Sequence, residues 1–203
     1  MTTRRLFLAA VPALLALPLL GATTRRAHAV DAASATAFVE EMLRDLLAIT
    51  NGSAPLPAKR AALTRVIEAR VDLDAVARFC LGRFWRTATP QQRTDYTQLF
   101  HRVLIKNVSE SVGEYQGVTY TLAGTVARQG DFGVVSIVNR PGNAPNKVEW
   151  VVDGAGPPKV IDVIAEGTSL RLTQRSDYAS YLSRNGNNVQ ALIDALRQQA
   201  AAG

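Results

Sequence analysis

The densest group of potentially reactive side chains lies at the end of an expected β-strand over residues 159–165. Asp162 and Glu166 are four residues apart, so in an extended strand both carboxyl groups would lie on one face. Two hydroxyl groups follow at residues 168 and 169, and two arginines follow at residues 171 and 175. Such a carboxylate pair could act as a general acid and a general base.

The same residues also suit a structural corner. In that interpretation Asp162 and Glu166 bind neighbouring backbone amides or the guanidinium groups of Arg171 and Arg175. We favour the corner, because no nucleophile or metal ligand lies nearby in the sequence. The alternative is an exported enzyme that uses Asp162 and Glu166, and it predicts a pH-dependent activity that Glu166→Gln removes.

Other residue types that support catalysis or metal binding are scarce. After residue 29 there is one histidine, His101, and the only cysteine, Cys80, lies in an apolar helical stretch typical of an unreactive thiol. Asp72 and Asp74 stand at an expected helix start, where capping is the favoured role. No glycine-rich phosphate loop follows a strand. The sequence therefore predicts no enzyme, no catalytic residue, no metal site and no cofactor.

Residues 1–29 have the three parts of a secretory signal peptide. A basic start is followed by an apolar run at residues 6–20 that contains two prolines, and then by the small-x-small motif AHA at residues 27–29. The run is shorter than the roughly 20 residues that span a bilayer. Two adjacent arginines also resemble a twin-arginine signal, so both export routes stay open. We expect cleavage after Ala29 and a periplasmic protein.

Cleavage would change the charge of the chain. The four arginines that it removes lower the formal net charge from +6 to +2. No run of lysine or arginine remains that could follow a phosphate backbone, so we expect no nucleic-acid binding. The remaining residues, 30–203, are of a length that suits one domain with its own core.

Apolar spacing and capping signals predict helices first, then strands, then helices. The clearest helix start is Thr89-Pro90-Gln91-Gln92, a capping box with proline at the first helical position. Short turns between the expected strands favour an antiparallel meander. The fold class is therefore α+β, with an antiparallel sheet of about four strands and N- and C-terminal helices packed on one face. Expected helices cover residues 32–51, from 57, 73–81, 90 to about 111, 177–185 and 189–199, and expected strands cover 118–126, 133–138, 147–152 and 159–165.

The apolar residues of these elements allow two interpretations. They either fill a solid core, as in a structural or adaptor protein, or enclose a cavity for an apolar ligand. Periodicity does not separate the two. The candidate cavity residues are Leu81, Phe84, Trp85, Leu99, Phe100, Val103, Val135, Ile137, Trp150, Val152, Val163 and Leu170.

Three stretches together resemble the MlaC family, the toluene-tolerance auxiliary proteins. They are DAVAR at residues 74–78, LGRFWRTATPQQR at residues 81–93, and DVIAEGTSL at residues 162–170. The likeness extends over about the whole chain after residue 29. It implies an α+β domain with a nuclear-transport-factor-like shape and no catalytic residues.

The resemblance also implies a function. Members of this family are periplasmic phospholipid-binding proteins, so residues 30–203 would form a lipid-binding domain with acyl chains held between sheet and helices. The implied partners are an outer-membrane lipoprotein complex and an inner-membrane ABC transporter complex with an MCE-domain protein. A subgroup of the family is associated with hopanoids, and a hopanoid is the alternative cargo.

Overall fold

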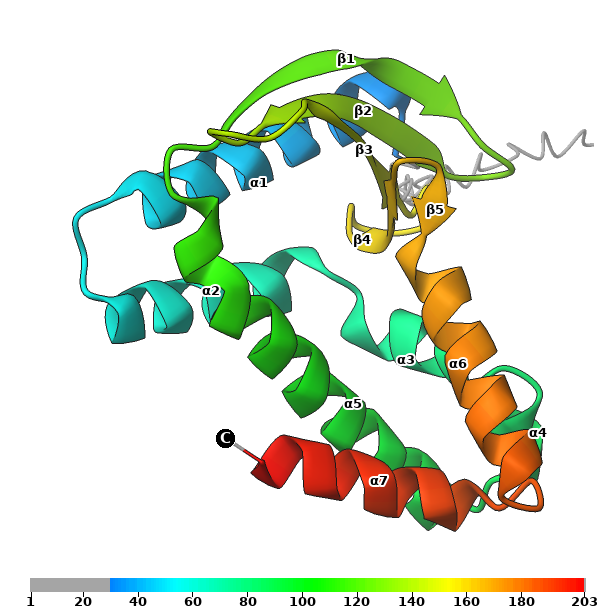
Figure 1. Ribbon diagram of the computed structural model, residues 1–203. Helices are drawn as coiled ribbons and strands as arrows, with labels where there is room; N and C mark the ends of the chain where they lie inside the picture. The colour runs from blue at the N-terminus through cyan, green and yellow to red at the C-terminus, as the bar shows by residue number, and fades with distance from the viewer. Residues whose placement is uncertain (1–29, 203) are drawn as a thin grey trace, which may run out of the picture.

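The computed structural model describes residues 30–202, so the expected signal peptide lies outside the described residues. The chain runs from helices into an antiparallel sheet and back into helices, as expected (Figure 1). In the described range no helix is both long and apolar enough to cross a membrane. The helices are α1 (Ala32–Asn51), α2 (Leu56–Arg70), α3 (Leu73–Leu81), α4 (Phe84–Thr87), α5 (Pro90–Glu110), the 3-10 helix η1 (Ser111–Tyr115), α6 (Leu170–Arg184) and α7 (Val189–Ala201).

The strands form one open sheet in the order β1-β2-β3-β4-β5, in which every neighbouring pair is antiparallel. The four expected strands are present, and the fifth is a two-residue strand that pairs with the end of β4. Glu166 and Gly167 both have positive φ angles, 48° and 79°, and make the tight turn between these last two strands. The bounds are β1 (Thr119–Ala127), β2 (Phe132–Asn139), β3 (Asn146–Val152), β4 (Val160–Ala165) and β5 (Thr168–Ser169).

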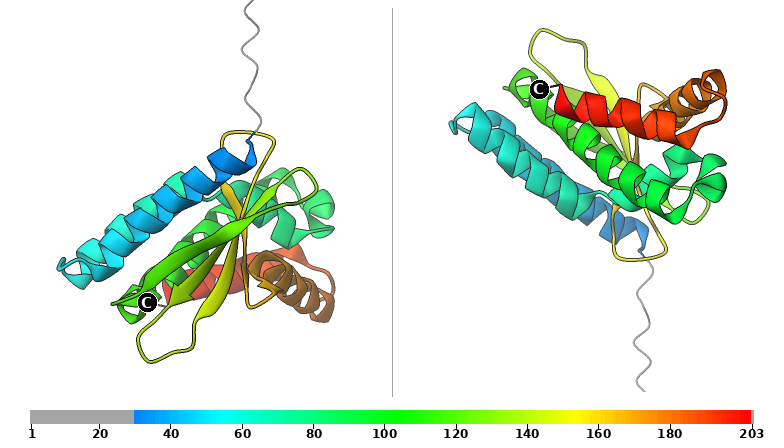
Figure 2. Two further views of the ribbon diagram at one scale, coloured as in Figure 1. Left: turned by 90° about the horizontal axis from the view of Figure 1, so that it is seen from above. Right: turned by 90° about the horizontal axis from the view of Figure 1, so that it is seen from below.

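The helices cover one face of this sheet, which confirms the expected layers. Figure 1 shows α1 along the underside of β1 and β2, with α3, α5 and α7 further below, and the view from above in Figure 2 has the strands in front of α5 and α7. Helix α1 lies directly under the sheet, where Val39 and Met42 pack with Val134 and Val152. A second core joins α3, α5, α6 and α7 further from the sheet.

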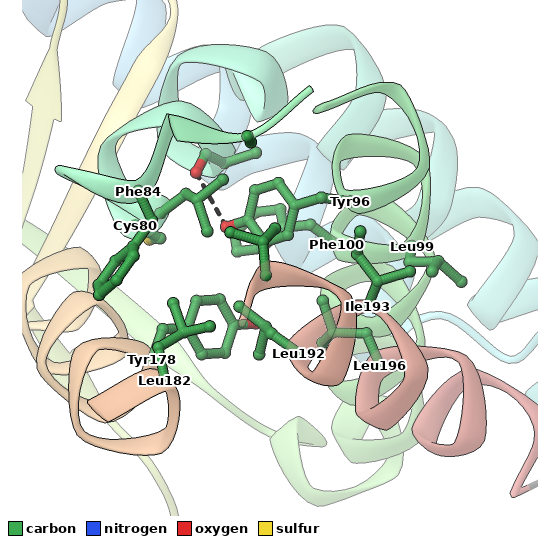
Figure 3. Packing of buried hydrophobic residues seen from close by; sticks show 14 of the residues in the cluster. Cys80, Phe84, Tyr96, Leu99, Phe100, Tyr178, Leu182, Leu192, Ile193 and Leu196 are labelled. Atoms are coloured by element: carbon green, nitrogen blue, oxygen red, sulfur yellow. Dashed lines mark hydrogen bonds between the residues drawn. The ribbon is translucent and has the colours of Figure 1, made fainter. Parts of the chain in front are cut away.

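The second core is closely packed around aromatic rings (Figure 3). Tyr96 is fully buried, and its hydroxyl donates to the carbonyl of Ala77 at 2.9 Å. Its ring centroid lies 5.9 Å from that of Phe100 and 6.2 Å from that of Tyr178, the latter in an edge-to-face arrangement. These contacts tie α3, α5 and α6 together, so this part of the helical layer is filled with side chains.

Side-chain caps start helices α3 and α5 at the residues that the sequence indicates. Thr89 accepts from the backbone N–H of Gln92 while the Gln92 side chain accepts from that of Thr89, so the capping box is confirmed. Asp72 accepts from the N–H of Ala75 and caps α3. Helix α6 differs, because it begins at Leu170, about two turns before the expected start at residue 177. Helix α4 and η1 are short elements that the sequence pattern did not indicate.

An ion pair covers the start of β2 and gives a pH-dependent contribution to stability. The Arg128 guanidinium, with Nη2 2.8 Å from Glu149 Oε2, holds the pKa of Glu149 below its usual value of 4.5. The carboxylate lies across Gly133, where a Cβ atom would clash with it. A lowered folded-state pKa stabilises the protein above the unfolded value, and this stabilisation is lost as the pH falls through the folded value.

We therefore expect Glu149→Gln to lower the free energy of unfolding by about 1 kcal/mol at pH 7, since Arg128 is partly exposed. The difference from the parent protein should shrink at pH 3, because protonation of the parent carboxylate increases as the pH falls toward its lowered pKa. Urea unfolding at both pH values measures it. A difference of equal size at both values would contradict the ionic origin.

Candidate functional site

A cavity of about 470 Å³ lies beneath the sheet, where β3 and β4 face α1, α2, α3, α5 and α6. The volume is within the range of about 300–1,000 Å³ that is typical of small-molecule sites. We call the buried part of its lining the deep wall. Because the deep wall is apolar and shielded from solvent, it offers a hydrocarbon chain an environment away from water. The buried apolar residues of this wall include Met42, Leu63, Ile67, Val76, Phe100, Val103 and Val160.

The cavity reaches the surface between α5 and α6. Five of its lining residues are exposed, and all five belong to these two helices. Asn107 and Val108 contribute from α5, and Leu170, Thr173 and Asp177 contribute from successive turns of α6. We call these five residues the mouth. It combines apolar side chains with polar ones, whereas the deep wall is almost wholly apolar.

The charged side chains on the wall are paired with others. Arg70 Nη2 lies 2.8 Å from Glu41 Oε1 and 3.2 Å from Asp45 Oδ2, and its guanidinium carbon lies 5.4 Å from the centroid of the Phe38 ring. The hydrogen bond to Glu41 is the main reason that the pKa of Arg70 is raised. The cavity thus gains little free charge from this side, which suits an apolar ligand.

Asp162 also lines the cavity, but it serves as an anchor for α6. Its side chain is 4% exposed. It accepts from the hydroxyl of Ser169 at 2.5 Å and from the backbone N–H of Arg171 at 3.1 Å, and Arg171 Nε lies 3.4 Å away. Every one of these partners belongs to the junction between β5 and the first turn of α6.

Glu166 points to a different partner. Its Oε1 accepts from the backbone N–H of Lys147 at 2.6 Å, which ties the turn after β4 to the start of β3. Asp162 and Glu166 therefore serve two separate structural contacts. The arrangement matches the structural corner that the sequence favours, with Arg171 as the guanidinium partner of Asp162.

A comparison with protein families decides the classification. The family described as MlaC protein matches residues 38–198. The chain belongs to the MlaC family. The resemblance that the three sequence stretches indicate is thereby confirmed, and it extends over both the helical layer and the sheet.

Two relatives of this MlaC family member are informative. The toluene tolerance protein ttg2D of Pseudomonas putida is 28% identical over 192 residues, which cover 93% of this chain and 87% of that protein. A phospholipid-binding protein from Ralstonia solanacearum, solved in complex with a phospholipid, matches with a TM-score of 0.72 and 26% identity. That match covers 82% of this chain and 97% of the other, so the two share the whole fold.

The structure brings five of the twelve candidate residues of this MlaC family member together around the cavity. Phe100 and Val103 come from α5, Trp150 from β3, Val163 from β4 and Leu170 from α6. Trp150 is held in place by a hydrogen bond from its indole nitrogen to the Ser136 hydroxyl at 3.0 Å. These five come from elements far apart in the sequence, and they meet only in the folded chain.

The other seven candidates lie outside the cavity. Leu81, Phe84 and Leu99 are buried in the core of α3, α5, α6 and α7, with Trp85 packed beside it. Val152 is buried between the sheet and α1. Since strand residues alternate and Val134 packs toward α1, Val135 and Ile137 lie on the opposite face of the sheet.

Several lining residues were absent from the candidate set. They come from α1 and α2, chiefly Met42, Leu46, Leu63, Val66 and Ile67. The signal was present in α1, because its apolar stripe is wider than one contact surface requires. One part of that stripe packs on the sheet and another part faces the cavity.

Cys80 lines the cavity as a buried thiol. Burial is the main cause that raises its pKa to about 12, and its sulfur lies 3.6 Å from the carbonyl oxygen of Arg171. A thiol with such a pKa stays protonated at neutral pH and makes a poor nucleophile. Among the described residues, no group of three or more His, Cys, Asp and Glu side chains could hold a metal ion.

Proposed function

We propose that the protein is a periplasmic lipid carrier that holds the acyl chains of a phospholipid in the cavity beneath its sheet. The observation that carries the proposal is the apolar cavity of about 470 Å³ with one mixed apolar and polar mouth. The phospholipid complex of the Ralstonia solanacearum relative supports the ligand class. A solid core, as in a purely structural protein, would leave no room for such a ligand.

The chemistry of the site is desolvation. Each methylene that moves from water into the deep wall contributes about 0.8 kcal/mol. A chain of a dozen or more methylenes therefore supplies ample affinity without a charged anchor. We propose that Phe100, Val103, Trp150, Val163 and Leu170 contact the chains, while the head group stays at the mouth in water.

Carrier function requires that lipid is received and released. We propose that the protein is exported, cleaved after Ala29, and moves lipid between an outer-membrane lipoprotein complex and an inner-membrane ABC transporter complex with an MCE-domain protein. Membership of the MlaC family and the signal-like residues 1–29 support this role. Such a carrier needs no catalytic residue, in keeping with the separate contacts of Asp162 and Glu166.

The decisive experiment is to identify the cargo. The mature protein is purified from the bacterial periplasm without detergent, extracted with organic solvent and analysed by mass spectrometry. We expect phospholipid in a fixed molar ratio to protein, and a hopanoid in its place would change the cargo but keep the carrier. Absence of any lipid, together with no uptake from labelled phospholipid vesicles, would contradict the proposal.

A further inference from the structure

A surface beside the cavity carries more arginine than acidic side chains. Residues 75–94, which lie between Asp74 and Asp95 and include most of α3 and all of α4, contain four arginines and no aspartate or glutamate. Helix α6 packs along α3 and adds two more arginines from its first two turns (Figure 1). We call this set the arginine surface; it consists of Arg78, Arg83, Arg86, Arg93, Arg171 and Arg175.

Aromatic rings connect these arginines into one surface. Two guanidinium groups lie over the Phe79 ring, with Arg171 at 4.5 Å and Arg175 at 5.0 Å from its centroid. The Arg175 guanidinium also lies against Gly82, at the junction of α3 and α4. On the other side of that junction, Trp85 is approached by Arg78 at 5.7 Å and by Arg93 at 5.6 Å.

Most of this positive charge is not neutralised by the protein. Arg78, Arg83, Arg86 and Arg175 are exposed, and none of them has a carboxylate within 4.0 Å in residues 30–202.

Two of the acids that flank the arginine surface have neighbours outside it: Asp74 Oδ1 lies 3.1 Å from His101 Nε2, and Asp95 accepts from Gln91. A third, Asp162, pairs with one member of the surface, Arg171. The exposed Asp177 lies at the mouth, two residues beyond Arg175. The surface therefore keeps an excess of positive charge with apolar rings between the charges.

The arginine surface reaches the cavity beside its mouth. Arg171 belongs to the arginine surface, with its guanidinium over the Phe79 ring, and it also lines the cavity next to the mouth residue Leu170. Beside it on the first turn of α6, Leu170 and Leu172 are 53% and 56% exposed, which is unusual for leucine. The arginine surface, with its partly exposed Trp85, thus meets the cavity at Arg171, and two exposed leucines lie beside that point.

We propose that this surface docks the protein on an anionic lipid bilayer, with the mouth turned toward the membrane. Lysine and arginine are attracted to anionic head groups, tryptophan prefers the interface, and exposed leucine enters the acyl boundary. An acidic protein partner would use the cations but would not require Leu170 and Leu172 beside the cavity. The proposal of membrane docking depends only on the residues of this surface. The role of docking in lipid delivery rests on the proposed function.

The test is vesicle binding by the mature protein and by the double variant Arg83→Gln, Arg86→Gln. Cosedimentation is measured with vesicles of phosphatidylglycerol and phosphatidylethanolamine, and with vesicles of phosphatidylcholine alone. We expect binding to the anionic vesicles only, weakened by high salt, and reduced on the order of tenfold in the double variant. Both side chains are exposed, so the fold should be unaffected.

The matched control is Arg60→Gln, Arg65→Gln, which removes two exposed cations from α2 and should leave vesicle binding nearly unchanged. If both double variants lost the same amount of vesicle binding, net charge alone would explain the attraction and the proposal would be overturned. Absence of binding to anionic vesicles at low salt would overturn it as well. Mass spectrometry of the bound lipid separates this result from the proposed function. A protein that carries lipid but ignores vesicles refutes docking alone, and one that binds vesicles but carries no lipid refutes the carrier.

Discussion

The variant Val163→Trp is expected to lose bound lipid almost completely and remain folded. Val163 is only partly buried, lines the cavity, and pairs across the sheet with Trp150, which lines it too. An indole at this place would fill space that an acyl chain otherwise occupies. The molar ratio of lipid to purified protein should fall more than about tenfold, since every excluded methylene removes about 0.8 kcal/mol of binding.

Stability separates blocking of the cavity from damage to the fold. Because the indole enters an existing void, we expect the free energy of unfolding to change by less than the roughly 1–3 kcal/mol that overpacking of a filled core costs. The matched control is Val126→Trp, on β1, where valine is 50% exposed and lies outside the cavity. It should carry a full complement of lipid. Normal lipid loading in the folded Val163→Trp protein would show that the cavity is not where the chains lie.

The sequence predicts the order and ends of most elements because local chemistry decides them. Thr89 and Gln92 cap α5 with their own side chains, and Asp72 caps α3, so both starts depend on residues within four positions. The meander follows from turns too short for any crossover between strands. These features need no knowledge of the tertiary structure.

Helix α6 is the element whose extent the sequence obscures. Its first two turns carry Leu170 and Leu172 exposed, while Thr173 and Asp177 lie at the mouth. A helix that borders an open cavity buries no continuous apolar stripe there, so the usual periodicity is missing. The start signal is nevertheless present, because Ser169 caps the helix by accepting from the N–H of Leu172.

The cavity itself is harder to predict for a related reason. A residue that faces a void and one that faces a packed neighbour have the same apolar type and the same spacing. Phe100 lines the cavity, whereas Leu99 beside it on α5 packs in the helical core. Only the relative placement of α1, α2 and α6 opens the space, and that placement depends on contacts between distant segments.

The variant Asp162→Ala, which removes the anchor of α6, is expected to lower the free energy of unfolding by about 3 kcal/mol. The carboxylate is nearly inaccessible and is shared by Ser169 and Arg171. Removing it leaves the backbone N–H of Arg171 and a partly buried guanidinium without their partner, and breaking a buried charge pair in this way costs about 3–5 kcal/mol. Urea unfolding measures the change.

Glu166→Gln is the matched control, because the amide oxygen can still accept from the N–H of Lys147 and the group is exposed. That variant should lose less than about 1 kcal/mol. A loss below about 1 kcal/mol in Asp162→Ala as well would contradict the anchoring role.

The anchor also links stability to the cavity. Since Asp162 fixes the first turn of α6, and Leu170 and Thr173 of that turn form part of the mouth, its loss should make hydrogen exchange faster in residues 170–174 than in α7. Bound lipid should then leave the protein faster. A uniform rise in exchange over the whole chain would instead indicate general destabilisation, because a local anchor acts first on the helix that it holds.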